Sequence, residues 1–133
     1  MYDFIDHPEH ITALREELES GRDWWNTLDQ AHLLDSFIKE SARLHPSDSI
    51  SMRRKALELY TFKDGTTVSI DDWVCVPLRG FLQDPRLYPN ADYFDGRRFM
   101  RQERPSASTE NAGYKFTDLK PAFPLWGLGK HAW

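Results

Sequence analysis

The chain has little cysteine, no long apolar run and no excess of basic charge. Its single cysteine, Cys75, cannot form an internal disulfide, so the sequence does not reveal the redox compartment. With 17 basic and 21 acidic residues the net charge is -4, which gives no electrostatic reason to expect nucleic acid or an anionic membrane as partner. No apolar stretch approaches the roughly 18 residues that cross a bilayer, and residues 1–6 lack the pattern of a signal peptide. The sequence as written predicts a cytoplasmic protein without a membrane segment.

The composition is that of a folding sequence. The 133 residues are 40% apolar and 14% aromatic, which suits one ordinary domain and argues against disorder. A capping residue at Asp6 and a helical apolar period predict a helix over residues 6–20. A second helix is predicted over residues 27–44, and Pro46 enforces its end. The apolar residues of this second helix fall on one face: Leu33, Leu34, Phe37, Ile38 and Ala42.

Beyond Pro46 the pattern changes to short strands and turns. Residues 60–62 and 67–70 read as two strands around an Asp64-Gly65 turn. Residues 73–76 read as a strand buried on both faces, because no polar residue alternates within it. From Pro77 onward turn signals dominate, and residues 101–113 form a polar loop. We therefore predict a mainly α fold with a small β part, arranged as a single incomplete domain over residues 1–133.

Three motifs follow one another in a specific order. Glu40-Ser41-Ala42-Arg43 is a Glu-x-x-Arg sequence inside the second predicted helix, within a Leu-Asp-Ser-Phe-x-Lys-Glu-Ser run over residues 34–41. Residues 92–99 carry Arg98 in a Phe-Asp-Gly-x-Arg-Phe sequence, and residues 126–131 read Trp-Gly-x-Gly-x-His. Glu-x-x-Arg alone would most simply be a solvated pair on a helix surface. Together the motifs resemble the cytochrome P-450 family of haem-thiolate monooxygenases, in its filamentous-fungal branch.

The resemblance implies a partial P-450 fold and a set of site residues. It makes Glu40, Arg43 and Arg98 an ion network that fixes the haem loop. It makes Arg54 the partner of one haem propionate, with Arg53 as a neighbouring alternative. His131 is then the second propionate contact, and Trp126 packs beside the thiolate. No residue of the chain is assigned a catalytic role or a metal-ligand role.

The position of the iron ligand departs from the family. Trp133 stands where the family has its cysteine, and an indole has an N–H donor but no lone pair for iron. Cys75 is no substitute, because a thiol between Val74 and Val76 in a buried strand is disfavoured as a thiolate. We therefore expect a carboxy-terminal fragment that ends at the ligand position. Such a chain would not bind haem stably and would not act as a monooxygenase.

The parent protein implied by the resemblance oxygenates a lipophilic small molecule, in fungal secondary metabolism. It would receive electrons from a reductase at the endoplasmic-reticulum membrane. Two alternatives remain open at this point. The chain could be a non-catalytic remnant that acts as a binding partner, or an unrelated α+β domain with accidental matches. The last alternative would gain support if Glu40, Arg43 and Arg98 pointed apart into solvent.

One further cluster has residue types that bind metal. His7, Glu9 and His10 are close enough in sequence to share a helical face. Zinc sites take three or four ligands, and neither a cysteine nor another histidine lies at a suitable spacing. A structural role for these histidines is therefore the simpler interpretation.

Overall fold

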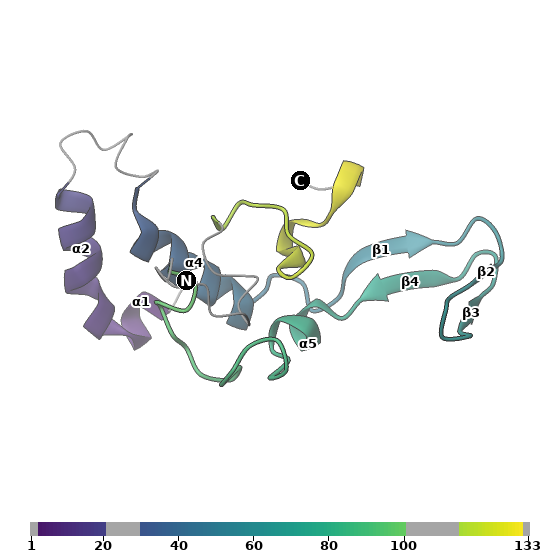
Figure 1. Cartoon of the computed structure of the whole chain (residues 1–133), viewed down its shortest axis with the longest axis horizontal. Coiled ribbons are helices and arrows are strands. Elements are labelled where there is room, and N and C mark those ends of the chain that lie inside the picture. Colours follow the sequence, from purple (N-terminus) through teal and green to yellow (C-terminus); the bar gives the residue numbers. More distant parts are fainter. Residues whose placement is uncertain (1–2, 21–29, 101–114, 132–133) are drawn as a thin grey trace.

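The computed structural model describes residues 3–20, 30–100 and 115–131 of the chain. Short helices gather around α4, and a long hairpin containing β1 and β4 extends away from them (Figure 1). The elements, in chain order, are α1 (Asp3–Asp6), the 3-10 turn η1 (Pro8–His10), α2 (Ile11–Glu19), α4 (His32–Leu44), β1 (Ser51–Lys55), β2 (Tyr60–Thr61), β3 (Thr67–Val68), β4 (Trp73–Val76), α5 (Leu78–Leu82), η2 (Pro124–Trp126) and η3 (Gly129–His131). This arrangement confirms a mainly α fold with a small β part.

The first predicted helix is divided into three pieces. The chain is already helical at Asp3, and α1 ends at Asp6 rather than beginning there. Pro8 has no N–H to donate, so the backbone continues as the 3-10 turn η1 before α2 begins at Ile11. The prediction of one helix over residues 6–20 was therefore wrong in its start and its continuity.

The second predicted helix corresponds to α4. It ends at Leu44 as predicted, two residues before Pro46, and His45 caps it with a non-helical backbone. Its predicted start at Thr27 lies outside the described residues. Leu33 and Phe37 are buried in a core with Leu14 of α2 and Phe94. A second core lies between α5, residues 88–99 and Phe123.

A carboxylate from α2 caps the amino terminus of α4. The Glu17 Oε1 and Oε2 atoms accept hydrogen bonds from the backbone N–H groups of Leu33 and Leu34, at 2.8 and 3.0 Å. Both N–H groups lie in the first turn of α4, where no helical carbonyl can accept them. The cap therefore joins two helices that are separated by a segment outside the described residues.

We expect Glu17→Ala to lower the free energy of unfolding by about 1–2 kcal/mol, the range typical of a lost helix cap. Urea unfolding followed by circular dichroism measures this loss. Glu16→Ala is the matched control, because Glu16 is an exposed glutamate on the same helix. Equal losses in the two variants would contradict a capping role for Glu17.

The strands form two small antiparallel sheets, in which β1 pairs with β4 and β2 pairs with β3. The predicted Asp64-Gly65 turn is confirmed: Gly65 has φ 89° and the Phe62 N–H donates to the Thr66 carbonyl at 2.8 Å. The flanking strands are shorter than predicted. No sequence pattern predicts β1, because its Ser-Met-Arg-Arg-Lys residues lack apolar alternation. Similarly, α5 lies in a segment that was predicted only as turns.

The prediction of a doubly buried strand at residues 73–76 was wrong. In β4 the exposed side chains of Trp73 and Cys75 alternate with the half-buried Val74 and Val76. The reason is that β4 belongs to a two-stranded sheet, and no helix of the described residues covers its outer face (Figure 1). Cys75 is consequently an exposed free thiol rather than a packing residue.

Two other predictions concern the polar loop and the lack of a membrane segment. The polar loop over residues 101–113 lies outside the described residues. Within the described ranges, no helix combines the length and the apolar character needed to cross a bilayer.

Candidate functional site: a buried ion network and the adjoining loop

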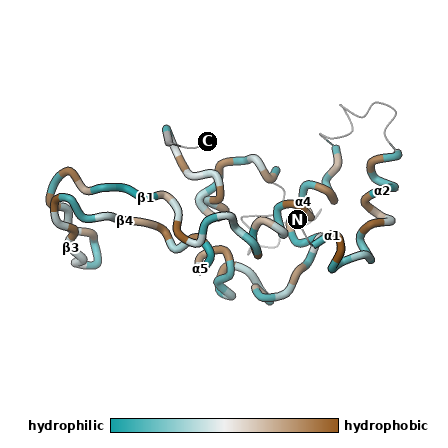
Figure 2. Tube along the Cα trace, turned by 180° about the vertical axis from the view of Figure 1, so that it is seen from behind, coloured by the Kyte–Doolittle hydropathy of each residue, from teal (hydrophilic) through white to brown (hydrophobic). Residues whose placement is uncertain are grey.

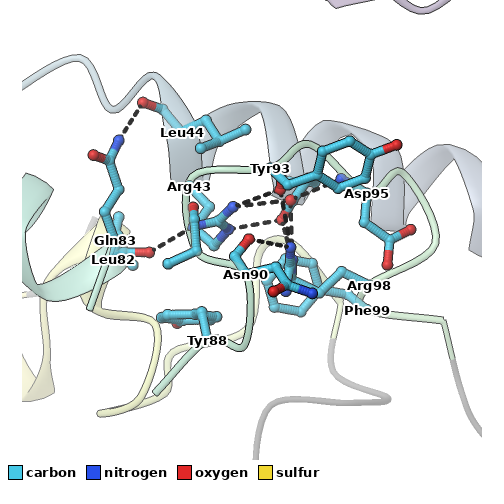
Figure 3. A network of polar contacts seen from close by, with 12 residues as sticks. Arg43, Leu44, Leu82, Gln83, Tyr88, Asn90, Tyr93, Asp95, Arg98 and Phe99 are labelled. Atoms are coloured by element: carbon cyan, nitrogen blue, oxygen red, sulfur yellow. Dashed lines mark hydrogen bonds and ion pairs between the residues drawn. The ribbon is translucent and has the colours of Figure 1, made fainter. Parts of the chain in front are cut away.

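Glu40 is the centre of a buried ion network. It is 0% exposed and lies on α4. Figure 3 shows Arg43 and Arg98, the two arginines of this network, among their polar contacts. The Arg43 Nε donates to Glu40 Oε2 at 2.8 Å, and the Arg43 Nη2 donates to Oε1 at 2.9 Å. The Arg98 Nε lies 3.0 Å from both oxygens, and the Asp95 N–H donates to Oε1 at 3.0 Å. The predicted three-residue network is therefore confirmed as a set of contacts, and the three side chains do not point apart.

The two guanidinium groups also bind backbone carbonyls at the end of α5 and in the irregular segment 83–93. Arg43 Nη1 donates to the carbonyls of Leu82 and Ala91, at 2.9 and 2.6 Å. Arg98 donates to Pro89 at 2.7 Å and to Tyr93 at 3.0 Å. These bonds satisfy carbonyls that no helix or strand could pair. The network thus converts a turn-rich segment into a fixed structure against α4.

The segment after residue 114 is attached to the other end of α4. The Asp35 carboxylate accepts the Phe116 N–H, with both oxygens at 3.0 Å. The Phe116 carbonyl in turn accepts the Trp126 indole N–H at 2.8 Å, and the two rings lie edge to face with centroids 5.1 Å apart. The Tyr88 hydroxyl donates to the Ala122 carbonyl at 2.7 Å, and burial raises the pKa of Tyr88 well above its usual value. Trp126 is therefore positioned through α4.

A cavity of about 270 Å³ brings together two of the predicted cofactor residues. Arg54 on β1 and Trp126 at the end of η2 both line it, and so does Arg53. A bulge in β1 at this point places Met52 at φ 51°, in the left-handed region. The side chain of His131 and the whole of Trp133 lie outside what the structure describes. The assignment of these residues to haem stays a prediction.

The histidines near the amino terminus pack against aromatic rings. His7 stacks on Phe94 with ring centroids 4.1 Å apart, and His10 lies edge to face with Phe37 at 5.6 Å. The exposed Glu9 accepts a hydrogen bond from His7 at 3.2 Å. Across residues 3–20, 30–100 and 115–131, no three His, Cys, Asp or Glu side chains are grouped so as to hold a metal ion.

Lys39 is the site residue that the sequence did not indicate. It lies between Ile38 and Glu40 on α4, yet its side chain is only 2% exposed. Its ammonium is 4.6 Å from the ring centroid of Phe99 and 5.1 Å from that of Phe123. Burial lowers the pKa of Lys39, and the carboxylates of Asp35 and Asp118 act in the opposite direction. A lysine beside the Glu-x-x-Arg motif would ordinarily be placed in solvent, so only the fold reveals this burial.

Comparison with known proteins decides the family. The family model described as Cytochrome P450 matches residues 1–116. The chain belongs to the cytochrome P450 family. Fungal P450 relatives include the monooxygenase easM of Aspergillus fumigatus, 39% identical over 135 residues that cover 98% of this chain and 25% of easM. The monooxygenase roqO of Penicillium rubens is 37% identical, with coverage of 96% and 25%. The chain therefore spans about a quarter of the length of the relatives it matches.

Solved P450 structures share the fold of the chain. A cyanobacterial CYP120A1 with bound retinoic acid aligns with a TM-score of 0.74 and 22% identity, covering 97% of this chain and 27% of that structure. A zebrafish P450 solved with progesterone aligns with a TM-score of 0.72 and 19% identity, again over 97% and 27%. These similarities establish a partial P450 fold.

The P450 family implies haem, and the residues present fit only part of that group. The guanidinium groups of Arg53 and Arg54 at the cavity suit the carboxylates of haem, because a guanidinium binds a carboxylate with two parallel donors. The axial position is different. The loop has Trp133 where a thiolate is needed, and the only cysteine of the sequence, Cys75, lies on β4. The chemistry of these residues therefore suits the haem carboxylates but not the haem iron.

Proposed function

We propose that the chain forms the haem-loop scaffold of a haem-thiolate monooxygenase of the filamentous-fungal type. The observation that carries the proposal is the buried Glu40 carboxylate bridged by Arg43 and Arg98. The parent reaction is the oxygenation of a lipophilic small molecule of secondary metabolism, with electrons from a reductase at the endoplasmic-reticulum membrane. The names of fungal relatives support this proposal. One of these relatives is a pyrichalasin C-7 hydroxylase of Pyricularia grisea, which is 31% identical to the chain.

In this proposal some site residues form the scaffold and others would contact the cofactor. The ion network fixes the segment 82–98 on α4 and has no chemical step of its own. Arg54 would hold one haem propionate, with Arg53 as the neighbouring alternative, and His131 would contact the second. Trp126 would pack beside the thiolate. The shared cavity of Arg54 and Trp126 supports placing both at one cofactor surface.

We further propose that the 133-residue chain does not itself perform monooxygenation. Haem supplies oxygen activation in this family only with a thiolate that donates electron density to the iron. Trp133 has no lone pair to offer in its place. Haem binding through the remaining residues is then weak, because carboxylate contacts alone leave the iron without its protein ligand.

A tryptophan-to-cysteine exchange tests this proposal. The chain is prepared with Cys75→Ser, mixed with haemin, reduced and exposed to carbon monoxide. We expect Trp133→Cys to gain the thiolate-type Soret band, and the chain with Trp133 to lack it. Trp73→Cys is the matched control, since it places a thiol at an exposed tryptophan of β4. A thiolate-type band in the chain with Trp133 would refute inactivity, and equal bands in the two cysteine variants would refute a special role for position 133.

A second candidate function is that of a non-catalytic binding partner. Apolar side chains at the far end of the hairpin favour it, since Leu57 is 86% exposed and Leu59, Ile70 and Trp73 are exposed as well. The tube in Figure 2 is coloured as hydrophobic along parts of this end of the hairpin. Exposed apolar clusters of this kind favour association and aggregation alike. A monodisperse, cooperatively melting, haem-free species in sedimentation would support this function. An insoluble chain would count against it.

A further inference from the structure

Two aromatic rings from distant parts of the chain meet at the buried Lys39 ammonium. Phe99 directly follows Arg98 of the ion network, and its N–H donates to the Ser36 hydroxyl on α4 at 3.0 Å. Phe123 directly precedes η2, the turn that contains Trp126. The two rings lie edge to face with centroids 5.6 Å apart. Lys39 therefore contacts both the ion-network segment and the loop that follows it.

We propose that Lys39 is a positioning residue that fixes the Trp126 loop on α4 by binding the ring faces of Phe99 and Phe123. A cation is attracted to the face of an aromatic ring and not to its edge, so the contact specifies orientation as well as proximity. An apolar side chain of the same length would fill the same space without specifying the ring orientation. The proposal rests on the proposed function only in naming the segment as the haem loop.

The electrostatic surroundings of Lys39 predict that its replacement affects the loop and not the stability of the whole fold. Burial disfavours the charged form of Lys39, although Asp35 on its own helix and Asp118 on the facing segment oppose that effect. Replacing a buried charge by an apolar side chain of similar volume is often neutral for overall stability. Lys39→Met should therefore leave the core intact while it loosens the loop. Replacing a residue with a merely structural role would lower the stability of the whole fold instead.

The test is hydrogen exchange measured by NMR on the haem-free chain. The reporters are the Trp126 indole N–H, which donates to the Phe116 carbonyl, and the Asp95 amide, which donates to Glu40. In Lys39→Met we expect exchange at Trp126 to accelerate about tenfold, a factor within the range of a desolvated cation–π contact. Exchange at Asp95 should stay unchanged. Lys39→Arg keeps the cation and should keep the protection, and Lys63→Met is the control at an exposed lysine.

Two outcomes would overturn the proposal. One is unchanged exchange at Trp126 in Lys39→Met, and the other is an equal acceleration at Trp126 and Asp95. If Lys39→Met does not fold, Phe123→Leu replaces it, because leucine keeps apolar volume and removes the ring face. Faster exchange at Trp126 in Phe123→Leu supports the proposal, and unchanged exchange overturns it. No haem is present in this experiment, so its result is independent of the spectral test of the proposed function.

Discussion

Arg43→Met is expected to lower the free energy of unfolding by about 3–5 kcal/mol, the cost of removing one partner from a buried ion pair. The substitution leaves Glu40, which is fully buried, with Arg98 as its remaining cationic partner among the described residues. It also leaves the carbonyls of Leu82 and Ala91 without the guanidinium that binds them. Urea unfolding of the chain, followed by circular dichroism, measures the loss.

An exposed arginine provides the control for this experiment. Arg86 is 87% exposed and forms a 2.6 Å ion pair with Asp84, and its hydrogen bond lowers the pKa of Asp84 to about 2. Exposed pairs contribute little to stability, so Arg86→Met should have a far smaller effect than Arg43→Met. If both substitutions lowered the free energy of unfolding equally, burial would not explain the contribution of the network to stability.

The network explains how an irregular segment acquires a fixed shape. Residues 83–100 contain no helix or strand, so their backbone groups need partners from elsewhere. Arg43 and Arg98 provide donors for four of their carbonyls, those of Ala91, Pro89, Asn90 and Tyr93. Arg43 of α4, together with Arg98 held by Glu40 of α4, thus replaces the ladder of hydrogen bonds that a sheet would supply.

The sequence predicted the parts of the fold that depend on local patterns. The end of α4 follows from Pro46, and the Asp64-Gly65 turn follows from the need for a positive φ at Gly65. Contacts between Glu40, Arg43 and Arg98 were predictable only because three motifs occur in the order of one family. The spacing of Glu40 and Arg43 alone is equally compatible with a solvated pair.

The features that the sequence did not reveal depend on distant partners. Lys39 is buried because Phe99 and Phe123 close over it, and neither ring is near it in sequence. Cys75 is exposed because β4 pairs with β1 alone in the part of the chain that the structure describes, whereas its apolar neighbours suggested a strand buried on both faces. No local pattern predicts the capping role of Glu17, which appears only when α2 and α4 lie side by side.

Phe37→Ala is the second substitution with a large expected effect. Phe37 is fully buried on α4, stacked on Phe4 with ring centroids 4.4 Å apart and edge to face with Phe94 at 4.9 Å. Removing a buried phenyl ring costs about 3–5 kcal/mol, as lost burial plus the cavity that remains. Phe62→Ala is the control, because Phe62 is 41% exposed at the hairpin and contacts only Tyr60 among the ring pairs described.

Gly96 lies against Phe37 in the same core. A Cβ atom at Gly96 would lie 3.0 Å from Phe37 Cδ2 and 3.1 Å from His10 Cε1, so Gly96→Ala should destabilise the chain by overpacking. Phe37→Ala removes the closest of these contacts, while the contact with His10 remains. The double variant should therefore be more stable than the sum of the two single losses predicts, by about 0.5–3 kcal/mol. Strict additivity in a double-mutant cycle of urea unfolding would show that Phe37 and Gly96 do not share this core. It would also show that α4 is not packed against residues 94–96.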